Sequence, residues 1–138
     1  MTDVHAKYIS IEDDKTEAGT RQVPIHSKLA PTLKRLKDAS KDGFIIAGLE
    51  ANKYGDRSDP VGKRFGRLKS NMEFGETYVF HSIRKTVTTM LENASVPENV
   101  TADIVGHEKP RITYGLYSGG TSLKLKARAI EKLRYPGM

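Results

Sequence analysis

The sequence contains no cysteine, which excludes disulfide bridges and thiolate metal sites from its 138 residues. That absence agrees with a reducing cytoplasm, where disulfides rarely persist. No apolar run approaches the roughly 20 residues that a membrane-spanning helix needs. The first five residues, Met1 to His5, lack the basic and then apolar pattern of a secretory signal. We therefore expect a cytoplasmic protein without a membrane segment.

Negative charge is in the minority. Lysine and arginine total 23 against 17 aspartates and glutamates, which gives a formal net charge of +6 and a pI of about 9.5. An excess of cations favours a polyanionic partner, with nucleic acid as the first candidate. Charge alone does not separate such a protein from an ordinary basic one, so the placement of the cations has to decide. The length suits a single domain over residues 1–138, large enough to bury a core.

Residues 1–26 predict a small β region. Short strands are expected at Tyr8–Glu12 and Arg21–Ile25, because residues 17–20 between them include the glycine that a hairpin turn favours. Pro24 has no backbone N–H to donate, so its strand should lie at an edge of the sheet.

Residues 27–138 are predicted to be mostly helical. Ser27 is expected to cap a first helix, and Asp59 is expected to cap a second one with Pro60 at its first position. Between them, residues 44–46 predict a short buried segment and residues 48–58 a loop. Apolar residues recur at helical spacing in both helices: Leu29, Leu33 and Leu36 in the first, and Val61, Phe65, Leu68 and Met72 in the second.

A third helix is expected from His81 to Ala94, with His81, Arg84 and Thr88 on one side. Its opposite, apolar side consists of Ile83, Val87, Met90 and Leu91. Residues 95–98 have the spacing of a capping box for a further helix, which should end at Gly106. Ser122 is expected to cap a last helix that carries Leu123, Ala127, Ile130 and Leu133.

Three short motifs in a fixed order carry the most chemical information. Residues 80–84 contain a His-x-x-Arg pattern, residues 104–108 contain Gly106-His107, and Tyr117 lies ten positions after His107. In these residues the chain resembles the tyrosine recombinase, or phage integrase, family, which has the three motifs in this order. A lone His-x-x-Arg is usually a surface pair and a lone Gly-His a helix cap, so the order carries the argument.

A fourth similarity lies near the start of the chain. The family has a lysine in the turn of a β-hairpin, followed by a basic residue and then Val-Pro, and residues 14–25 are similar to that pattern. The resemblance makes Lys15 the candidate general acid. It extends over most of the chain, from about Tyr8 to about Ile130.

The chemistry of the family explains these residue types. Phosphodiester transfer builds negative charge on the phosphate, which fixed donors such as Arg84, His81 and His107 can stabilise. Tyr117 would attack phosphorus and hold the DNA as a 3′-phosphotyrosine. A tyrosine pKa of about 10 requires a base or a cationic field, and the resemblance assigns the base to His81. Lys15 would protonate the leaving 5′ hydroxyl. No metal or other cofactor is implied, because arginine and histidine take its place.

The resemblance implies an α+β, mostly helical fold, in which a small antiparallel hairpin or sheet packs against a helical bundle. It implies double-stranded DNA as the partner and no membrane. In this family the segment after the tyrosine often packs on a neighbouring subunit of a tetramer, so residues 122–134 are a candidate contact. Packing within the same chain is the alternative. Cations beside the predicted stripes are candidates for phosphate contact: Lys63, Arg64, Arg67, Lys69 and Lys85.

The chain departs from the family pattern at its start, where the amino-terminal DNA-binding domains of typical integrases are also missing. The family's site also uses an arginine upstream of the hairpin, and no arginine precedes Arg21 here. We therefore expect a partial catalytic domain from a phage or other mobile element, with weak or no activity alone.

Two points stay open. Tyr114, seven positions after His107, competes with Tyr117, which is favoured by the family spacing. A non-catalytic DNA-binding or assembly module derived from the fold is the alternative to a recombinase. A metal hydrolase has little support, because the four histidines form no ligand motif.

Overall fold

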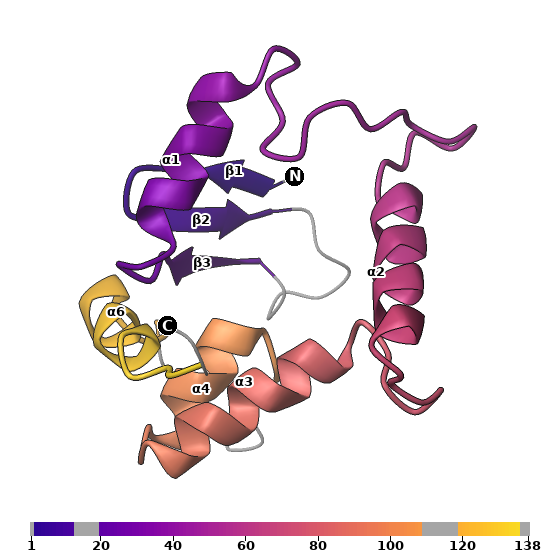
Figure 1. Ribbon diagram of the computed structural model, residues 1–138. Helices are drawn as coiled ribbons and strands as arrows, with labels where there is room; N and C mark the ends of the chain where they lie inside the picture. The colour runs from indigo at the N-terminus through magenta and orange to yellow at the C-terminus, as the bar shows by residue number, and fades with distance from the viewer. Residues whose placement is uncertain (1, 13–19, 109–118, 136–138) are drawn as a thin grey trace. The chain divides into compact units, whose positions relative to one another are not determined.

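The computed structural model describes residues 2–12, 20–108 and 119–135. The chain forms two compact units, one of residues 1–34 and 87–138 and one of residues 35–86, and each is described by itself. The described residues form a small antiparallel sheet and five helices, which confirms the predicted α+β, mostly helical fold (Figure 1). The assignment of residues 1–138 to one domain stays a prediction.

The sheet of the first unit has three antiparallel strands in the order β1 (Thr2–Val4), β2 (Tyr8–Ile11) and β3 (Arg21–Pro24). The two predicted strands are confirmed to within one residue as β2 and β3, whereas β1 was not predicted. Pro24 pairs with Tyr8 at the edge of the sheet, as the missing N–H requires. The predicted turn falls in residues 13–19, outside the described residues.

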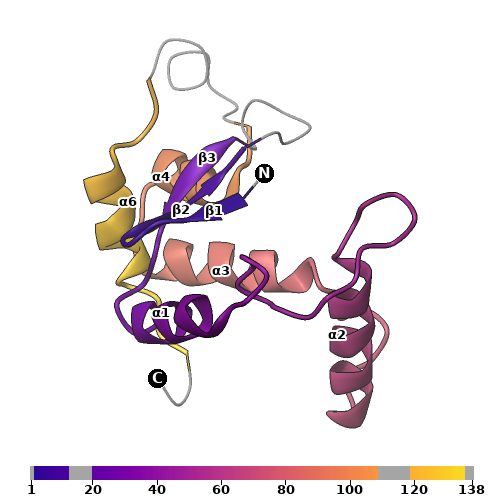
Figure 2. The same ribbon diagram turned by 90° about the horizontal axis from the view of Figure 1, so that it is seen from above.

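The core of the first unit surrounds α4 (Glu98–Val105). This helix and α6 (Leu123–Ile130) both pack against β3, and Figures 1 and 2 show the three elements side by side. The later turns of α3 (Ser82–Asn93) contribute Leu91, which is completely buried. The other buried members of the core are Val96, Val100, Ile104, Val105, Ala129, Ile130 and Leu133.

Helix ends in this unit confirm two predictions and correct two. Gly106 ends α4 in a left-handed conformation, and the Ser122 hydroxyl accepts from the Leu125 N–H at 3.4 Å. Ser27 is not the cap of α1 (Ala30–Ala39), because the helix begins three residues later and the hydroxyl donates to Glu131. The capping box at residues 95–98 is also wrong. Pro97 is the N-cap of α4, without a side-chain hydrogen bond.

The second unit contains α2 (Asp59–Asn71), which begins one residue earlier than predicted. Its N-cap is Ser58 rather than Asp59 and makes no side-chain hydrogen bond, and Pro60 lies in the first turn. The loop before it is organised by Asp42, which accepts from the N–H groups of Phe44 and Gly48, both at 3.1 Å. Arg57 donates to the same carboxylate at 2.9 Å and lies 3.6 Å from the centroid of the Phe44 ring. These bonds, led by that from Arg57, hold the pKa of Asp42 well below its usual range.

Exposure in the second unit corrects several predicted buried positions. Phe44 and Ile46 are 50% and 51% exposed, so the predicted buried segment is wrong. The arginine over the Phe44 ring explains how this side chain stays near the surface. Helix α2 has no buried residue. The residues of the predicted apolar stripes that stand half exposed or more in this unit are Leu68 and Met72, at 57% and 59%.

The start of α3 behaves in the same way, with Ile83 48% exposed. Phe65 of α2 packs edge-on against Phe80, with ring centroids 5.1 Å apart. None of the described helices is long and apolar enough to cross a bilayer.

Candidate functional site

The end of α4 places His107. The N–H groups of Gly106 and His107 both donate to the Ala102 carbonyl, at 2.8 and 3.1 Å. Gly106 has φ 74° and ψ 43°, the left-handed conformation that turns the chain away from the helix axis. His107 follows this turn with an exposed side chain. The imidazole is therefore accessible from solvent directly after the helix end.

Arg21, the first residue of β3, reaches the same helix end. Its Nε donates to the Ile104 carbonyl at 3.0 Å. A Cβ atom on Gly106 would lie 2.6 Å from the Arg21 Nη1 and 2.7 Å from its Cζ. The guanidinium therefore occupies the space that any side chain at position 106 would need. The sequence marked Arg21 only as the basic residue of a hairpin pattern and gave no reason to place it here.

Asp103 connects α4 to the chain beyond the predicted nucleophile. Its Oδ2 accepts from the Thr121 N–H at 2.7 Å. Tyr114 and Tyr117 fall in residues 109–118, and Lys15 falls in residues 13–19, so all three lie outside the described residues. Their roles stay predictions.

His81 and Arg84 lie at the start of α3 in the second unit. His81 directly precedes the helix, and its carbonyl accepts from the N–H groups of Arg84 and Lys85 at 3.1 and 3.5 Å. The His81 side chain is exposed and that of Arg84 half-buried. Residues three apart at a helix start face the same side, so a single ligand could contact both His81 and Arg84. The structure describes this pair and His107 separately, in different units.

The five cations predicted to contact DNA also belong to the second unit, on α2 and α3. Lys63, Arg64, Arg67 and Lys85 are exposed, and Lys69 is half-buried. Exposed cations along one helix are compatible with phosphate contact. Among the described residues, no group of three or more histidines or carboxylates could hold a metal ion.

Helix α6 is anchored within its own chain. Lys126 is buried, and its Nζ donates to the Gln22 carbonyl of β3 at 2.6 Å. Ala129 and Ile130 enter the core. Packing within the chain, the alternative left open by the sequence, is thus what the structure shows for this helix. The helix ends at Ile130, and contact between subunits through residues 122–134 stays a prediction.

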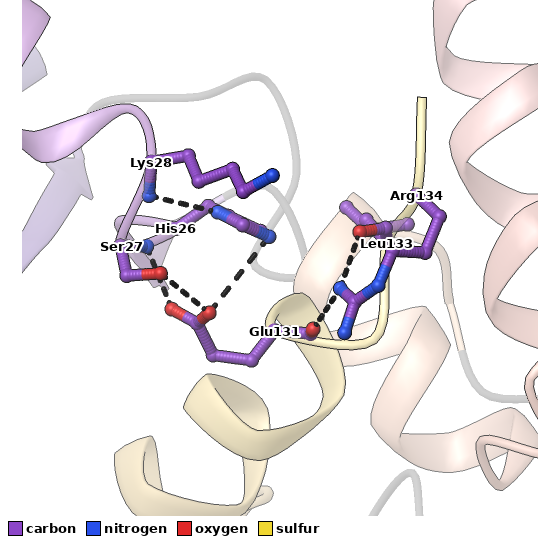
Figure 3. A network of polar contacts seen from close by, with 6 residues as sticks. All are labelled: His26, Ser27, Lys28, Glu131, Leu133 and Arg134. Carbon is purple, nitrogen blue, oxygen red and sulfur yellow. Dashed lines mark hydrogen bonds and ion pairs between the residues drawn. The ribbon is translucent and has the colours of Figure 1, made fainter. Parts of the chain in front are cut away.

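A polar network fixes the end of α6 (Figure 3). Glu131 accepts from the N–H and hydroxyl of Ser27, at 2.6 and 2.8 Å. The His26 Nε2 lies 3.8 Å from the same carboxylate, while its Nδ1 accepts from the Lys28 N–H. The two bonds from Ser27, together with the charges of His26 and Arg134, lower the pKa of Glu131.

Comparisons with known proteins point to one family. Residues 1–121 match the phage integrase family. The chain is 28% identical over 140 residues to a protein named "Tyrosine recombinase XerC-like" from Caldanaerobacter subterraneus subsp. tengcongensis. The alignment covers 92% of this chain and 36% of that relative, so the chain spans about a third of the relative's length. No solved structure matches the chain significantly.

Proposed function

Because the chain belongs to the phage integrase family, we propose that it serves site-specific DNA recombination through a 3′-phosphotyrosine intermediate on Tyr117. The observation that supports this most is the placement of the motif residues. His81 immediately precedes α3 and His107 follows α4, both exposed, with Arg84 one turn after His81. Side chains at helix ends are open to a large polyanion in a way that core positions are not.

The proposed reaction needs no group beyond the chain and the DNA. The Tyr117 oxygen attacks phosphorus while His81 takes its proton, and the bond from phosphorus to the 5′ oxygen breaks. Lys15 gives that oxygen a proton. Arg84 and His107 donate to the non-bridging oxygens, where negative charge grows in the transition state. Rejoining is the reverse of these steps with a new 5′ hydroxyl.

Double-stranded DNA is the proposed partner. The exposed cations on α2 and α3 would neutralise phosphates, which makes binding depend on salt. They are Lys63, Arg64, Arg67 and Lys85, and the half-buried Lys69 lies beside them on α2. We further propose integration or excision of a phage or other mobile element as the role of the whole protein, with a tetramer on DNA as its assembly.

We propose weak cleavage by these 138 residues alone, because no arginine precedes Arg21 to serve as the family's further phosphate clamp. Loss of one electrostatic donor of this kind costs about 100- to 1000-fold in rate. Labelled suicide DNA, which traps the covalent product, makes even a slow reaction measurable on a denaturing gel.

The test is formation of a covalent protein–DNA adduct. We expect a faint adduct with the wild-type chain, none with Tyr117→Phe, and an undiminished one with the matched control Tyr114→Phe. Adduct formation that survives Tyr117→Phe would refute the assignment of the nucleophile. Salt-dependent DNA binding without adduct in any variant would favour the alternative, a non-catalytic DNA-binding module. Efficient adduct formation by the wild type would contradict weak activity.

A further inference from the structure

The proposed reaction makes no use of Arg21, yet this side chain contacts the end of the helix that carries His107. We propose that Arg21 is a positioning residue, which fixes the Gly106-His107 turn from β3 and thereby sets where the His107 imidazole stands. The inference rests on the proposed function, because it assigns a role within the same site.

The first step concerns the carbonyls at the end of α4. The last four carbonyls of a helix have no partner within the helix. Ala102 receives two N–H groups from the following turn, and Ile104 receives the Arg21 Nε. Residue Ile104 is only 4% exposed, so water has little access to replace that donor. A cation at a helix C-terminus also complements the helix dipole. Arg21 therefore supplies a hydrogen bond that the end of α4 would otherwise lack.

The second step concerns contact with the turn itself. The Arg21 guanidinium lies against the position that a Cβ of Gly106 would take, with Nη1, Cζ and Nε all within 3.0 Å of it. The guanidinium thus lies against the one backbone residue that precedes His107. Because its Nε is held on the Ile104 carbonyl, the planar guanidinium limits how far the turn can shift.

The third step concerns what holds Arg21. It pairs with Ile11 of β2 in the sheet. The next residue, Gln22, accepts from the buried Lys126 of α6 at 2.6 Å. The strand end is therefore held from the sheet on one side and from α6 on the other. Because the backbone of Arg21 is fixed in this way, its side chain can hold the turn that it contacts in a defined position.

The consequence for the reaction is a loss of rate rather than of binding. A donor to a phosphate works only near its productive geometry, and a displacement of about 1 Å costs about 100-fold. With Arg21→Ala, His107 would keep its chemistry but lose its fixed position.

The experiment compares Arg21→Ala and Arg21→Lys with Arg128→Ala, an exposed arginine on α6 that controls for lost charge. In Arg21→Ala, amide hydrogen exchange of Gly106 and His107 should be about tenfold faster, the effect of losing one charge-assisted bond. Exchange of the Val96 amide, bonded to the Leu91 carbonyl in the core, should not change. Adduct formation at saturating suicide DNA should slow about tenfold or more, with the Kd for DNA as in Arg128→Ala. Arg21→Lys keeps the charge and one donor, so it should recover part of both losses.

Unchanged exchange at Gly106 and His107 in Arg21→Ala would overturn the inference, whatever the activity. A loss of adduct explained entirely by weaker DNA binding would overturn it as well. Failure of the proposed function has a different appearance: the wild type forms no adduct, while exchange at the turn is still faster in Arg21→Ala. That outcome supports the placement of Arg21 and rejects the recombinase.

Discussion

Gly106 meets two separate requirements at one position. Its φ of 74° lies in the left-handed region, which costs an L side chain about 1–2 kcal/mol. Its missing Cβ leaves room for Arg21, because a Cβ at this position would lie only 2.6 Å from the Arg21 Nη1. The first requirement is visible in the sequence as a glycine after a helical pattern, whereas the second depends on a residue 85 positions earlier in the numbering (106 − 21).

These two requirements can be separated by a double-mutant cycle. Gly106→Ala should destabilise the chain by more than the conformational cost of about 1–2 kcal/mol, because the new methyl group displaces the guanidinium from its bond to the Ile104 carbonyl. In the Arg21→Ala background that bond is absent, so the same substitution should cost less. Urea unfolding measures each free energy. Gly119→Ala, at a glycine with nothing within 4 Å, is the control and should change little. Strictly additive costs would show that the two residues do not interact.

Lys126 is buried, although lysine is a residue type that usually lies at the surface. A lysine on a helix is ordinarily assigned to the solvated side, so no pattern in the sequence places it in the interior. The structure buries it to 8% exposure and gives its Nζ the Gln22 carbonyl as acceptor. A single side chain then joins α6 to β3, a contact across 104 residues that no local pattern reveals.

Removing that ammonium should destabilise the first unit. Lys126→Met keeps most of the side-chain volume but loses a hydrogen bond from a charged donor, which is worth about 1.5–3 kcal/mol. Urea unfolding followed by circular dichroism measures the change, and Lys124→Met, an exposed lysine of the same helix, is the matched control. Equal stability of the two variants would mean that the buried charge makes no net contribution to the free energy of unfolding, which is the case for some buried ionic groups.

At the scale of elements, helix ends were predictable where the backbone itself decides. Gly106 and Ser122 act through left-handed φ and a local hydroxyl bond, and each stands where the sequence placed it. Pro60 lies in the first turn of α2, one residue further in than predicted. Ser27 has the right chemistry for a cap, but Glu131 offers it a charged acceptor 104 residues away. A local rule cannot foresee a competitor that only the fold brings near.

Apolar periodicity has a similar limit. In α3 it predicts the burial of Leu91 and the partial burial of Val87 and Met90 against the core. In α2 the same spacing is present, yet Leu68 and Met72 stand more than half exposed. Periodicity identifies which side of a helix is apolar, but what covers that side depends on the rest of the fold.

The contacts of Glu131, at the end of α6, with Ser27 and His26, before α1, should make the stability of the fold depend on pH. The Glu131 carboxylate has a lowered pKa in the folded chain, so its stabilisation is present above the ordinary glutamate value of about 4.3. It is lost as the pH falls through and below that value. We expect wild-type stability to drop more steeply between about pH 5.5 and pH 3 than that of Glu131→Gln.

Urea midpoints across this range measure the effect. Ser27 and His26 contact the carboxylate and Arg134 acts on it through its charge, and all three are retained in the variant. Glu92→Gln, at an exposed glutamate of α3, should keep the wild-type slope. Parallel curves for wild type and Glu131→Gln would mean that the network in Figure 3 adds no stability.

At the scale of the whole molecule, the order of the motifs identified the family before any coordinates, and residues 1–121 match it. The sequence could do this because His-x-x-Arg and Gly-His each lie within a few residues at helix ends. It could not supply the supporting residues Arg21 and Asp103, whose partners are far along the chain or are backbone groups. The roles of Lys15 and Tyr117 rest on the family resemblance alone.

The net charge of +6 makes a prediction that no single motif does. If α2 provides the DNA contact, its exposed cations should account for part of the salt dependence of binding, and cations elsewhere should not. Each phosphate contact contributes about 0.9 to the slope of log K against log salt. Arg64→Gln combined with Arg67→Gln should therefore lower the slope by about 1.8, or twice that contribution.

The matched control removes the same charge from α6, by Lys124→Gln combined with Arg128→Gln, two exposed residues. Fluorescence anisotropy with a labelled duplex over a series of salt concentrations gives both slopes. The control should weaken binding only through the lower net charge, a long-range effect that falls away within a Debye length of about 8 Å at physiological salt. Equal losses of slope in the two variants would show that DNA responds to the total charge of the molecule, and α2 would then have no special claim to the contact.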